Sequence, residues 1–557
     1  MQNFLTTQFK KINILLLMFF IPYLVSCNNE DLFLEAQVEN TEDILENTTS
    51  GIQDPVFTFN PQRWGIVQGV VSDEVALKNK EILNSIMTKL KEININTMKI
   101  GAMDAYFKVD VNKIGRVENA GGSIQIPSDF HLEMSDDTYL RVQPNAAATY
   151  TLMTTYLTDN SKISGGNLVG DRFEHDYSPF TDAAGVKRDE HGWGHLIWII
   201  GSHNVIVDNV NLSNATGDGI VFHSETLRNN DGSLMPGTRE VNNVIVRNVN
   251  IDECRRNGIS ILDGRNITFD NCNITNTGQG EQQYDASGSK IYSSSGTAPR
   301  YGIDLESIRT RNEDGTLNET ALIEGVFIKN SNFTGNEAGD IVVYTASNVI
   351  IENNYFDKWV ANKASHNVTI RNNTFESRDP SFFAIGINSF ITSLGEELNH
   401  DYVIVNNIIK NYGIGIRVAG LNQLVSNNTI LNCTTGIFLI NDLVNSTFRD
   451  NQITSNLNLS YGYKNFYNCQ NLDNVTIKDE IIEVQNRPIN FNVLLNNSVS
   501  NTEQVTFTNC LFNTANSNFK MLIKATKNIK FESNRSNTDF QIIDSENIVL
   551  INNQTNL

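Results

Sequence analysis

The chain has 557 residues, of which 40% are hydrophobic and 19% are charged, so it can bury a large core. Its formal net charge of −21 argues against nucleic acid or an anionic membrane surface as a general partner. The six cysteines show no metal-ligand spacing, so we assign no metal site and expect no cofactor, with Ca²⁺ as the one ion left open.

The first 27 residues resemble a bacterial lipoprotein signal. Two lysines at positions 10 and 11 precede the apolar run 12–23, which is too short to span a bilayer. The sequence Leu-Val-Ser-Cys at 24–27 resembles a lipobox, in which the cysteine becomes the lipid-bearing first residue of the mature chain. The resemblance implies lipidation of Cys27, and a plain secretory signal peptide is the alternative.

Residues 28–58 are polar and acidic without periodicity, and we interpret them as a flexible tether. Their start, Asn-Asn-Glu-Asp at 28–31, resembles the acidic surface-export tag of Bacteroidota lipoproteins. The two resemblances together imply a protein held on the cell outer membrane by its lipid alone and exposed at the surface. A periplasmic or secreted protein is the alternative.

Residues 72–94 carry the one convincing helical pattern. Apolar residues that include Ile82, Ile86 and Leu90 fall mostly on one face, and Ser72 can cap the first turn. An amphipathic helix in front of a repeat array can cover the open apolar end and the unpaired strand edges of the first repeat. We therefore expect this helix to be an N-terminal cap.

From residue 201 onward a short phrase recurs, in which asparagines flank segments of alternating hydrophobicity. Period-2 alternation within a repeat of roughly 20–25 residues is typical of a β-solenoid. Asparagine tolerates the left-handed backbone of tight bends, and its copy in the next coil lies within hydrogen-bonding reach, about 4.8 Å away. The sequence predicts an all-β chain with a single parallel β-helix over residues 59–557. The phrase occurs at 204–212, 243–251, 266–274, 326–333, 348–356 and 367–375, and it continues at 474–477, 504–507, 528–531 and 547–550.

The beginning of the strand region adds a resemblance. A helix, then Gly-Gly-Ser-Ile-Gln-Ile-Pro at 121–127, then an alternating strand from His131 resembles the opening of pectin-lyase-like right-handed β-helix proteins. The resemblance extends from about residue 60 to the end and implies a right-handed solenoid. That superfamily includes polysaccharide lyases, glycoside hydrolases and phage tailspikes, so the resemblance implies no single activity.

Polar residues gather in the middle coils. When the coils are aligned on the isoleucines at 220, 259 and 303, each isoleucine points inward and its neighbours at −1, +1 and +3 point outward. The same positions in later coils are mostly apolar, so we expect the chemistry in the middle of the solenoid. The polar strip contains Asp218, His223, Arg255, Arg256, Tyr301, Asp304, Glu306, Asp340 and Tyr344.

Asp304 and Glu306 are the predicted catalytic acid and base. At positions i and i+2 of one strand they share a face, with Cα atoms roughly 6.6 Å apart. Side-chain directions could place the carboxyls roughly 6.5–9.5 Å apart, as in inverting glycosidases, or about 5 Å apart, as in retaining ones. Crowding raises the pKa of one carboxyl and supplies an acid near neutral pH. A Ca²⁺ site or a solvated acidic strand is the alternative interpretation.

Other residues of the strip are predicted to assist this pair. Asp218 and His223 are further catalytic candidates. Arg255 and Arg256 can bind a sugar carboxylate or sulfate, with a salt bridge to the acidic pair as the alternative. The remaining predicted substrate-binding residues are Tyr301, Asp340, Tyr344, Trp193 and His195.

Insertions at 225–240, 278–299 and 310–320, with an earlier excursion at 170–195, break the repeat. Long loops in a solenoid tend to build binding walls. We expect these to form a wall for a glycan, because aromatic faces suit sugar rings. The aromatic residues concerned are Tyr177, Trp193, Tyr284 and Tyr292.

Two enzyme families share short features with this strip. Tyr-Gly-Ile-Asp at 301–304 resembles the Tyr-Gly-Phe-Asp of alginate C5-epimerases, although Leu-Glu follows where that motif has Pro-His. The paired acids are similar to those of iota-carrageenases. We therefore expect a monomeric protein that acts on an acidic or sulfated polysaccharide, first as a glycoside hydrolase. A polysaccharide lyase or C5-epimerase acting on uronates, and a non-catalytic glycan-binding protein or adhesin, stay open.

Overall fold

The computed structural model describes residues 48–49, 55–110, 122–182, 184–225, 229, 233–307, 309–311, 317–319, 322–379, 381, 384–389, 399–465, 472–492 and 504–555. The predicted lipoprotein signal, Cys27 and most of the predicted tether lie outside these residues. Within the described part of the chain, no helix is long and apolar enough to cross a membrane.

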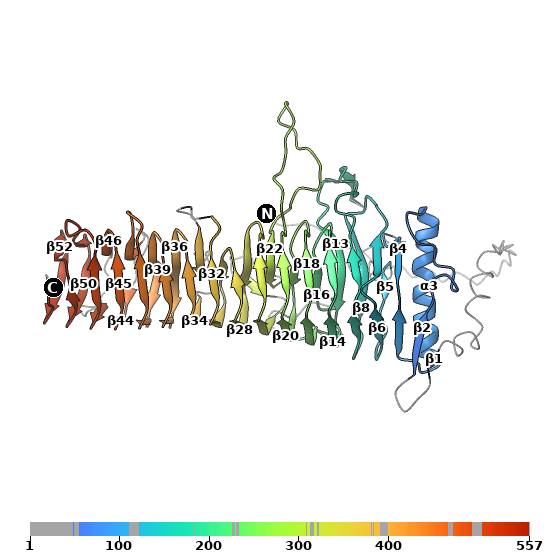
Figure 1. Ribbon diagram of the computed structural model, residues 1–557, viewed down its shortest axis with the longest axis horizontal. Helices are drawn as coiled ribbons and strands as arrows, with labels where there is room; N and C mark the ends of the chain where they lie inside the picture. The colour runs from blue at the N-terminus through green and yellow to red at the C-terminus, as the bar shows by residue number, and fades with distance from the viewer. Residues whose placement is uncertain are drawn as a thin grey trace, which may run out of the picture. The chain divides into compact units, whose positions relative to one another are not determined.

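The described chain from Val56 onward winds as a parallel β-helix, which confirms the predicted fold (Figure 1). Each coil contributes one strand to each of three parallel ladders, which we call face 1, face 2 and face 3. Along the chain, a coil passes first through face 1, then through face 3 and last through face 2. In one coil these strands are β14 (His203–Asp208), β15 (Asn211–Ser213) and β16 (Ile220–His223), and the chain then returns to face 1 at β17 (Asn242–Arg247).

The three faces extend along the described solenoid, with a shift of register between Val418 and Gly420 where β36 pairs with β39. Face 1 contains β2 (Val56–Phe59), β3 (Thr97–Ile100), β6 (His131–Met134), β9 (Lys162–Ser164), β14, β17, β20 (Gly264–Asp270), β25 (Ile323–Lys329), β28 (Ala346–Glu352), β31 (His366–Arg371), β34 (His400–Val405), β37 (Leu424–Ser426), β40 (Thr447–Arg449), β44 (Val475–Lys478), β47 (Val505–Thr508), β50 (Lys527–Glu532) and β53 (Glu546–Ile551). Face 2 contains β5 (Ile124–Gln125), β8 (Thr149–Tyr156), β13 (Trp193–Ile200), β16, β19 (Ile259–Ile261), β22 (Tyr301–Glu306), β27 (Gly339–Tyr344), β30 (Val360–Lys363), β33 (Ile385–Ser389), β36 (Ile414–Leu421), β39 (Thr435–Val444), β42 (Tyr461–Asn465), β46 (Arg487–Asn492), β49 (Met521–Lys524) and β52 (Phe540–Ile543). Face 3 contains β4 (Met103–Phe107), β7 (Thr138–Val142), β10 (Asn167–Val169), β15, β18 (Asn250–Asp252), β21 (Asn273–Thr275), β26 (Asn332–Thr334), β29 (Tyr355–Phe356), β32 (Thr374–Glu376), β35 (Ile408–Lys410), β38 (Thr429–Leu431), β41 (Gln452–Ser455), β45 (Ile481–Val484), β48 (Leu511–Thr514) and β51 (Arg535–Ser536).

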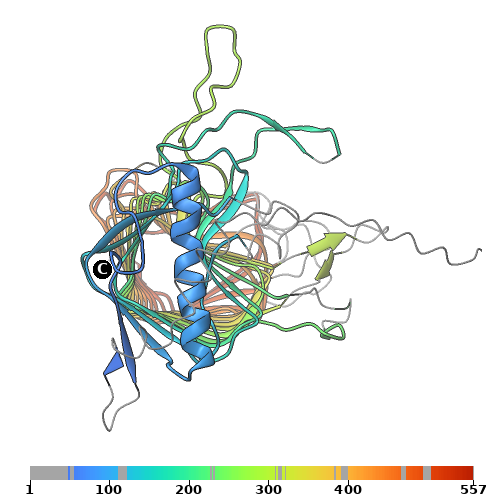
Figure 2. The same ribbon diagram turned by 90° about the vertical axis from the view of Figure 1, so that its right-hand side faces the viewer.

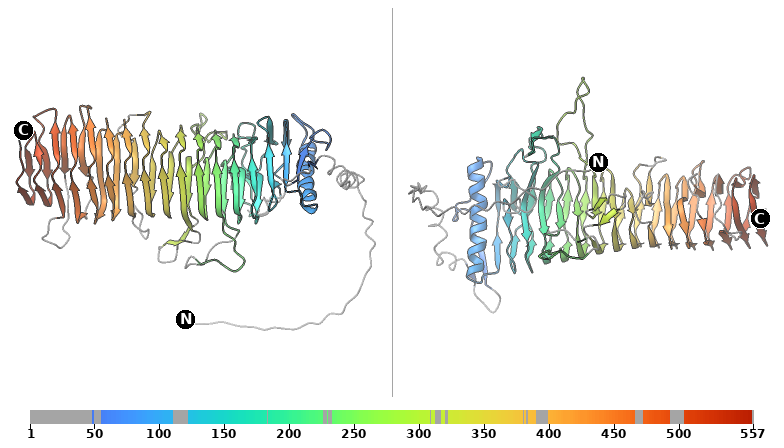
Figure 3. Two further views of the ribbon diagram at one scale, coloured as in Figure 1. Left: turned by 60° about the horizontal axis from the view of Figure 1, so that its bottom comes forward. Right: turned by 180° about the vertical axis from the view of Figure 1, so that it is seen from behind.

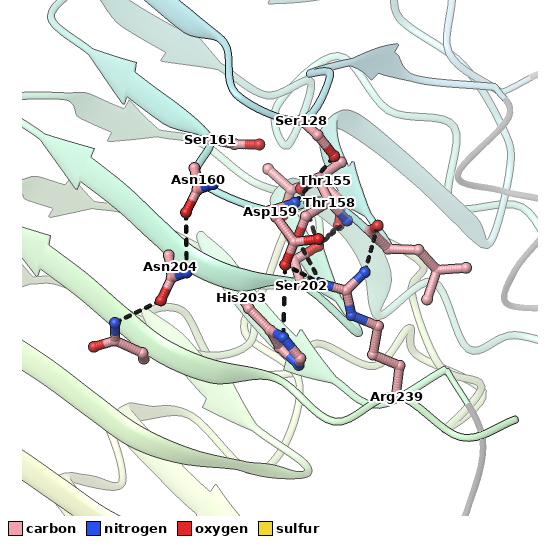
Figure 4. A network of polar contacts seen from close by, with 12 residues as sticks. Ser128, Thr155, Thr158, Asp159, Asn160, Ser161, Ser202, His203, Asn204 and Arg239 are labelled. Atoms are coloured by element: carbon pink, nitrogen blue, oxygen red, sulfur yellow. Dashed lines mark hydrogen bonds and ion pairs between the residues drawn. The ribbon is translucent and has the colours of Figure 1, made fainter. Parts of the chain in front are cut away.

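Asparagines take many of the bends, and they form hydrogen-bonded columns along the solenoid. Asn160, Asn204 and Asn243 all have positive φ, between 55° and 57°, which asparagine adopts more readily than most residues. Asn204 donates from Nδ2 to Oδ1 of Asn160 at 2.9 Å, and Asn243 donates to Asn204 at 2.6 Å (Figure 4). This column starts on a carboxylate, because Asn160 donates to Asp129 at 2.8 Å.

A second, buried column runs between faces 1 and 3 and donates in the opposite direction. Asn354 donates to Asn373 at 3.1 Å, and the same pattern continues through later coils until Asn451 donates to Glu480 at 2.8 Å. Each of these amides is at most 3% exposed and also donates to a backbone carbonyl. The column satisfies polar groups inside the solenoid that would otherwise be costly to bury.

The helix α3 (Asp73–Glu92) covers the first coil, as the amphipathic pattern predicts (Figure 2). Ser72 accepts a hydrogen bond from the amide of Val75, at 3.5 Å, and is the N-cap residue. Leu83, Ile86 and Leu90 are fully buried, and the helix packs against β4 and β5. The helix therefore shields apolar side chains at this end of the solenoid.

The solenoid begins slightly earlier than the sequence predicts. Strand β2 starts at Val56, inside the predicted tether, and it pairs in parallel with β3 and in antiparallel with β1 (Thr48–Thr49). Phe57 and Phe59 are 0% and 2% exposed. Two buried aromatic side chains in a polar segment are too few to produce a detectable periodic signal, which explains the misplaced boundary.

Candidate functional site

The predicted catalytic pair lies on β22 of face 2. Ile303 and Leu305 are fully buried in the interior, and the alternation of the strand turns Asp304 and Glu306 to the opposite side. Asp304 pairs in register with Ser260 of β19 and with Val342 of β27. The structure thus brings the two carboxylates to one face of one strand, as the sequence predicts.

Asp304 is 3% exposed, whereas Glu306 is partly exposed. Burial, and then the charge of Glu306, raise the pKa of Asp304 to about 7, against the opposing charge of Arg256. The Nδ2 of Asn257 donates to Oδ2 of Asp304 at 3.2 Å. A carboxyl group with this pKa carries a proton for much of the time at neutral pH, which is the state that a general acid needs.

Asp218 organises the coil before Asp304 and is fully buried. It accepts hydrogen bonds from Nη1 of Arg256 at 2.7 Å, from the amide of Asn257 at 2.8 Å and from Oγ of Ser260 at 2.9 Å. Both oxygens of the Asp218 carboxylate therefore accept hydrogen bonds from the protein itself. The geometry therefore gives Asp218 a positioning function toward Arg256 and Asn257, in place of the catalytic one that the sequence suggested.

The two neighbouring arginines differ in their surroundings. Arg256 is 15% exposed, stacks over the ring of Trp193 at 5.2 Å and lies between Asp218 and the Asp304 side of the site. Arg255 donates from Nε to the carbonyl of Ser295 at 2.9 Å and from Nη1 to that of His191 at 2.6 Å. Its guanidinium also lies 4.3 Å from the ring centroid of Tyr177. Arg256 stays a candidate substrate ligand, whereas Arg255 holds loops together.

The histidines lie apart from the carboxylate pair. His195 is fully buried, its Nδ1 accepts a hydrogen bond from the amide of Asp218 at 3.2 Å, and burial lowers its pKa to about 4. It is therefore a neutral structural side chain, which corrects its prediction as a substrate ligand. His223 ends β16 on face 2 and is 7% exposed, with β19 between it and β22.

The tyrosines of the strip flank the pair. Tyr301 begins β22, its amide donates to Oδ1 of Asn257 at 2.8 Å, and burial raises its pKa to about 12. Tyr344 pairs in register with Glu306, and the Nζ of Lys363 lies 4.7 Å from its ring centroid. Both tyrosines are partly exposed, so both stay candidate substrate contacts.

Asp340 is the second residue of β27 and is fully buried. It accepts hydrogen bonds from Nδ2 of Asn336 at 2.9 Å and from the amide of Lys358 at 2.8 Å. Burial, and then the charge of Asp357, raise the pKa of Asp340 to about 8. Asp340 has no exposed surface, and its hydrogen bonds stabilise the neighbouring bends. The direct contact with substrate that the sequence predicted does not fit this position.

Two long loops rise on the same side of the solenoid, between faces 3 and 2 (Figures 1 and 2). The first, 170–192, contains β11 (Phe180–Thr181) and β12 (Lys187–Arg188), and the second spans 276–300. Arg172 ties them together by donating to the carbonyls of Gln279 at 2.6 Å and Ser294 at 3.1 Å. Lys290 and Asp189 form an ion pair at 2.7 Å.

The other two insertions leave the coil at a different bend. Residues 225–240 and the hairpin of β23 (Arg309–Arg311) and β24 (Leu317–Glu319) connect face 2 to face 1. Figure 3 shows that the described insertions project from the coils coloured teal to yellow-green. The prediction that all insertions build one wall is therefore wrong, because insertions leave face 2 at both of its edges.

The first loop contains a buried chain of polar groups that sequence reasoning missed. Asp171 accepts hydrogen bonds from the Tyr150 hydroxyl, from Thr216 at 2.8 Å and from Nδ1 of His175 at 2.9 Å. Nε2 of His175 lies 2.9 Å from Nδ1 of His191. The chain ends where Nε2 of His191 lies 3.0 Å from the carbonyl of Ser178.

This chain anchors the loop, because His175 and His191 lie on the loop while Tyr150 and Thr216 of the solenoid hold Asp171. The Ser178 carbonyl can only accept, so Nε2 of His191 carries hydrogen. Burial lowers the pKa of His191. A His-x15-His spacing has no known sequence signature, so only the fold reveals the pair.

A cavity of about 350 Å³ lies at the bend between faces 3 and 2, in the coils after the second loop. Sequence reasoning missed it, because its residues come from four different bends with no shared motif. Its lining consists of Glu337, Ala338, Asp357, Lys358, Trp359, Ser377, Arg378, Asp379, Ser381, Ala384, Ile385 and Tyr412.

In the described part of the chain, no group of three or more His, Cys, Asp or Glu side chains is arranged to hold a metal ion. Cys254, Cys272, Cys433 and Cys510 are buried free thiols. They are at most 2% exposed and act as small apolar side chains of the interior.

Comparison with known proteins supports the fold. The family described as "Right handed beta helix region" matches residues 159–305 and 237–453, which together extend over more than half of the chain. The chain belongs to this right-handed β-helix family. The match includes every strand of face 2 from β13 to β39 and therefore the candidate site.

Two curated relatives come from Bacillus subtilis (strain 168). The uncharacterized protein YclG is 31% identical over 340 residues, which cover 60% of this chain and 52% of YclG. The SPbeta prophage-derived uncharacterized protein YorA is 28% identical over 318 residues, which cover 56% of this chain and 49% of YorA. The chain thus spans about half the length of the curated relatives that it matches.

Among solved structures, a mutant tailspike protein of E. coli bacteriophage HK620 in complex with a pentasaccharide aligns with a TM-score of 0.52. The alignment covers 92% of this chain and 84% of the tailspike, at 12% sequence identity. At this identity the likeness shows a shared β-helix fold and nothing about residues.

Proposed function

We propose that the protein is a polysaccharide-degrading glycoside hydrolase, with Asp304 as general acid and Glu306 as its carboxylate partner. The observation that carries the proposal is the environment of the pair. Burial raises the pKa of Asp304 to about 7, while the more exposed Glu306 stands on the same face of β22. A carboxyl group that is often protonated at neutral pH, with a second carboxyl group on the same face of the strand, is the arrangement that glycoside hydrolysis uses.

In the proposed reaction, Asp304 donates its proton to the oxygen of the scissile glycosidic bond. Glu306, as a carboxylate, either activates water or attacks the sugar, and the i, i+2 spacing on the strand is compatible with both outcomes. Asn257 holds the Asp304 carboxyl, and Asp218 holds Asn257 through its amide. The two loops above the bend supply Trp193, Tyr284 and Tyr292 as sugar contacts.

One observation favours a second candidate function. Arg256 lies partly exposed between Asp218 and Asp304, where its guanidinium could neutralise the carboxylate of a uronate, as a polysaccharide lyase or C5-epimerase requires. The same arginine would bind the acidic or sulfated ring of a hydrolase substrate. Against the lyase, burial raises the pKa of Tyr301 to about 12, so its hydroxyl stays protonated at neutral pH and is not available to remove a proton from the substrate.

The test is digestion of a panel of algal, plant and host polysaccharides, followed by two assays. We expect new reducing ends without absorbance from unsaturated uronates. Both signals together would support a lyase. Neither signal on any member of the panel would contradict the hydrolase and favour a C5-epimerase or a glycan-binding protein.

A further inference from the structure

The cavity of about 350 Å³ described above is joined to the candidate site by one aromatic contact. The Trp359 indole, in the cavity wall, lies beside Tyr301, the first residue of β22, because both rings close over Gly339. Both rings pack against Gly339, where an added Cβ would lie 1.9 Å from Nε1 of Trp359 and 2.8 Å from Cε1 of Tyr301. A glycine at this position is therefore needed to let the indole reach Tyr301.

The cavity lies at a defined distance from the carboxylate pair. Trp359 precedes β30, and β30 follows β27, which pairs directly with β22. Two strand spacings separate the coil of Trp359 from that of Asp304, roughly 10 Å along the solenoid axis. A second hollow shares Ser377, Arg378 and Tyr412 with the cavity. It extends the cavity toward Asn456 and Leu457, farther from the carboxylate pair along the solenoid.

The lining combines apolar and aromatic surface with polar side chains that already have partners. Tyr412 donates to the carbonyl of Lys358 at 3.1 Å and closes one side. The two cations of the lining each lie near a carboxylate, Lys358 at 3.9 Å from Glu337 and Arg378 at 3.2 Å from Asp357. Since Asp379 adds a further negative charge, the cavity has no excess positive charge to offer an anionic ring.

We propose that this cavity binds an uncharged sugar ring of the glycan chain, two coils from the point of cleavage, with the Trp359 indole as its stacking surface. The proposal rests on the proposed function, because it takes Asp304 as the reacting end. An aromatic face with carboxylate and hydroxyl acceptors is suited to a ring that carries hydroxyl donors and apolar C–H faces. The substrate is accordingly a linear glycan long enough to occupy both places.

The test uses the full chain and two sets of probes. The neutral probes are cello-, xylo-, manno- and chito-oligosaccharides of two to six rings, and the anionic probes are oligogalacturonates and oligomannuronates of the same lengths. Ala384 lines the cavity and is only partly buried, so Ala384→Trp should fill the cavity without removing a core side chain. Phe327→Ala is the matched control, because Phe327 is a 39% exposed aromatic residue on β25 of face 1, outside the cavity.

We expect a neutral hexasaccharide to bind the wild-type protein, and Ala384→Trp to weaken that binding at least about tenfold, as the loss of a central aromatic contact does. Trp359→Ala should weaken it similarly, whereas Phe327→Ala should leave it within about twofold of the wild type. Binding of the corresponding disaccharide at the reacting end should change little in any variant.

Three results would overturn the proposal: hexasaccharide affinity unchanged in Ala384→Trp, a loss confined to the anionic series, or no binding of any probe. Product formation separates this proposal from the proposed function. Binding of the hexasaccharide through the cavity without any cleavage would support the sugar-binding cavity and contradict the proposed hydrolase. Cleavage that is insensitive to Ala384→Trp would support the hydrolase and contradict the sugar-binding cavity.

Discussion

At the scale of single residues, the surroundings of Asp304 decide the chemistry. Asp304→Asn and Glu306→Gln should each lower turnover by about 10²–10⁴-fold, because each removes a proton-transferring or charge-stabilising group. Thermal melting at pH 4 should change little, since each replacement is isosteric and Asp304 is largely protonated at this pH. A structural Ca²⁺ site would behave differently, because both variants and EDTA would then lower the melting temperature. Full turnover in both variants would contradict the assignment.

The raised pKa of Asp304 also makes stability depend on pH. The unfolded carboxyl has a pKa of about 3.9, so between pH 4 and 7 the folded state binds more protons than the unfolded state, and stability falls as pH rises. Asp340 and Glu480, with pKa values of about 8, act in the same direction. We expect Asp304→Asn to melt at a higher temperature than the wild type at pH 8.5 and at the same temperature at pH 4. Equal curves at both pH values would show that Asp304 is ionised normally.

The direction of the hydrogen bonds in the asparagine columns predicts how an exchange between asparagine and aspartate affects stability. Asn204 both donates to Asn160 and accepts from Asn243, so Asn204→Asp loses one bond and places two acceptors face to face. We expect a loss of about 1 kcal/mol in the free energy of unfolding, measured by denaturant titration. Asp129 only accepts in its column, so Asp129→Asn is the control and should be nearly neutral. Equal effects of the two changes would show that the column has no direction.

At the scale of elements, α3 is the part whose loss should affect folding without affecting chemistry. Deleting residues 73–92 would expose the apolar side chains of β4 and β5 that the helix covers. We expect aggregation, measured by size-exclusion chromatography and light scattering. A monomeric, soluble deletion variant would show that the first coil needs no cover.

The elements also show what the sequence could and could not predict. Local rules fixed the bends, because asparagine with positive φ, as at Asn204, and inward isoleucines, as at Ile303, depend only on neighbours in the chain. The same rules placed Asp304 and Glu306 on one face. They could not show that Arg255 is occupied by the carbonyls of His191 and Ser295, because loops from distant coils supply these contacts. The cavity beside Trp359 depends likewise on several coils at once.

At the scale of the whole molecule, a lipid anchor at Cys27 would determine where the solenoid acts. Cys27 lies outside the described residues, so its lipidation stays a prediction from the lipobox. Replacing Cys27 with serine should release the protein into the soluble fraction, because serine cannot take the place of the lipid-bearing cysteine. Membrane fractionation after a high-salt wash checks this. A Cys27→Ser protein that still sediments with membranes would require another means of attachment.

The opposed directions of the two asparagine columns have an electrical consequence. Each side-chain amide is a small dipole, and in the column of Asn204 every dipole points one way along the solenoid axis, as peptide dipoles do in an α-helix. In the buried column from Asn354 to Glu480 the dipoles point the other way. The positive end of the first column meets the carboxyl group of Asp129, and that of the second meets the carboxyl group of Glu480, so each row of dipoles ends on an acceptor of its last hydrogen bond.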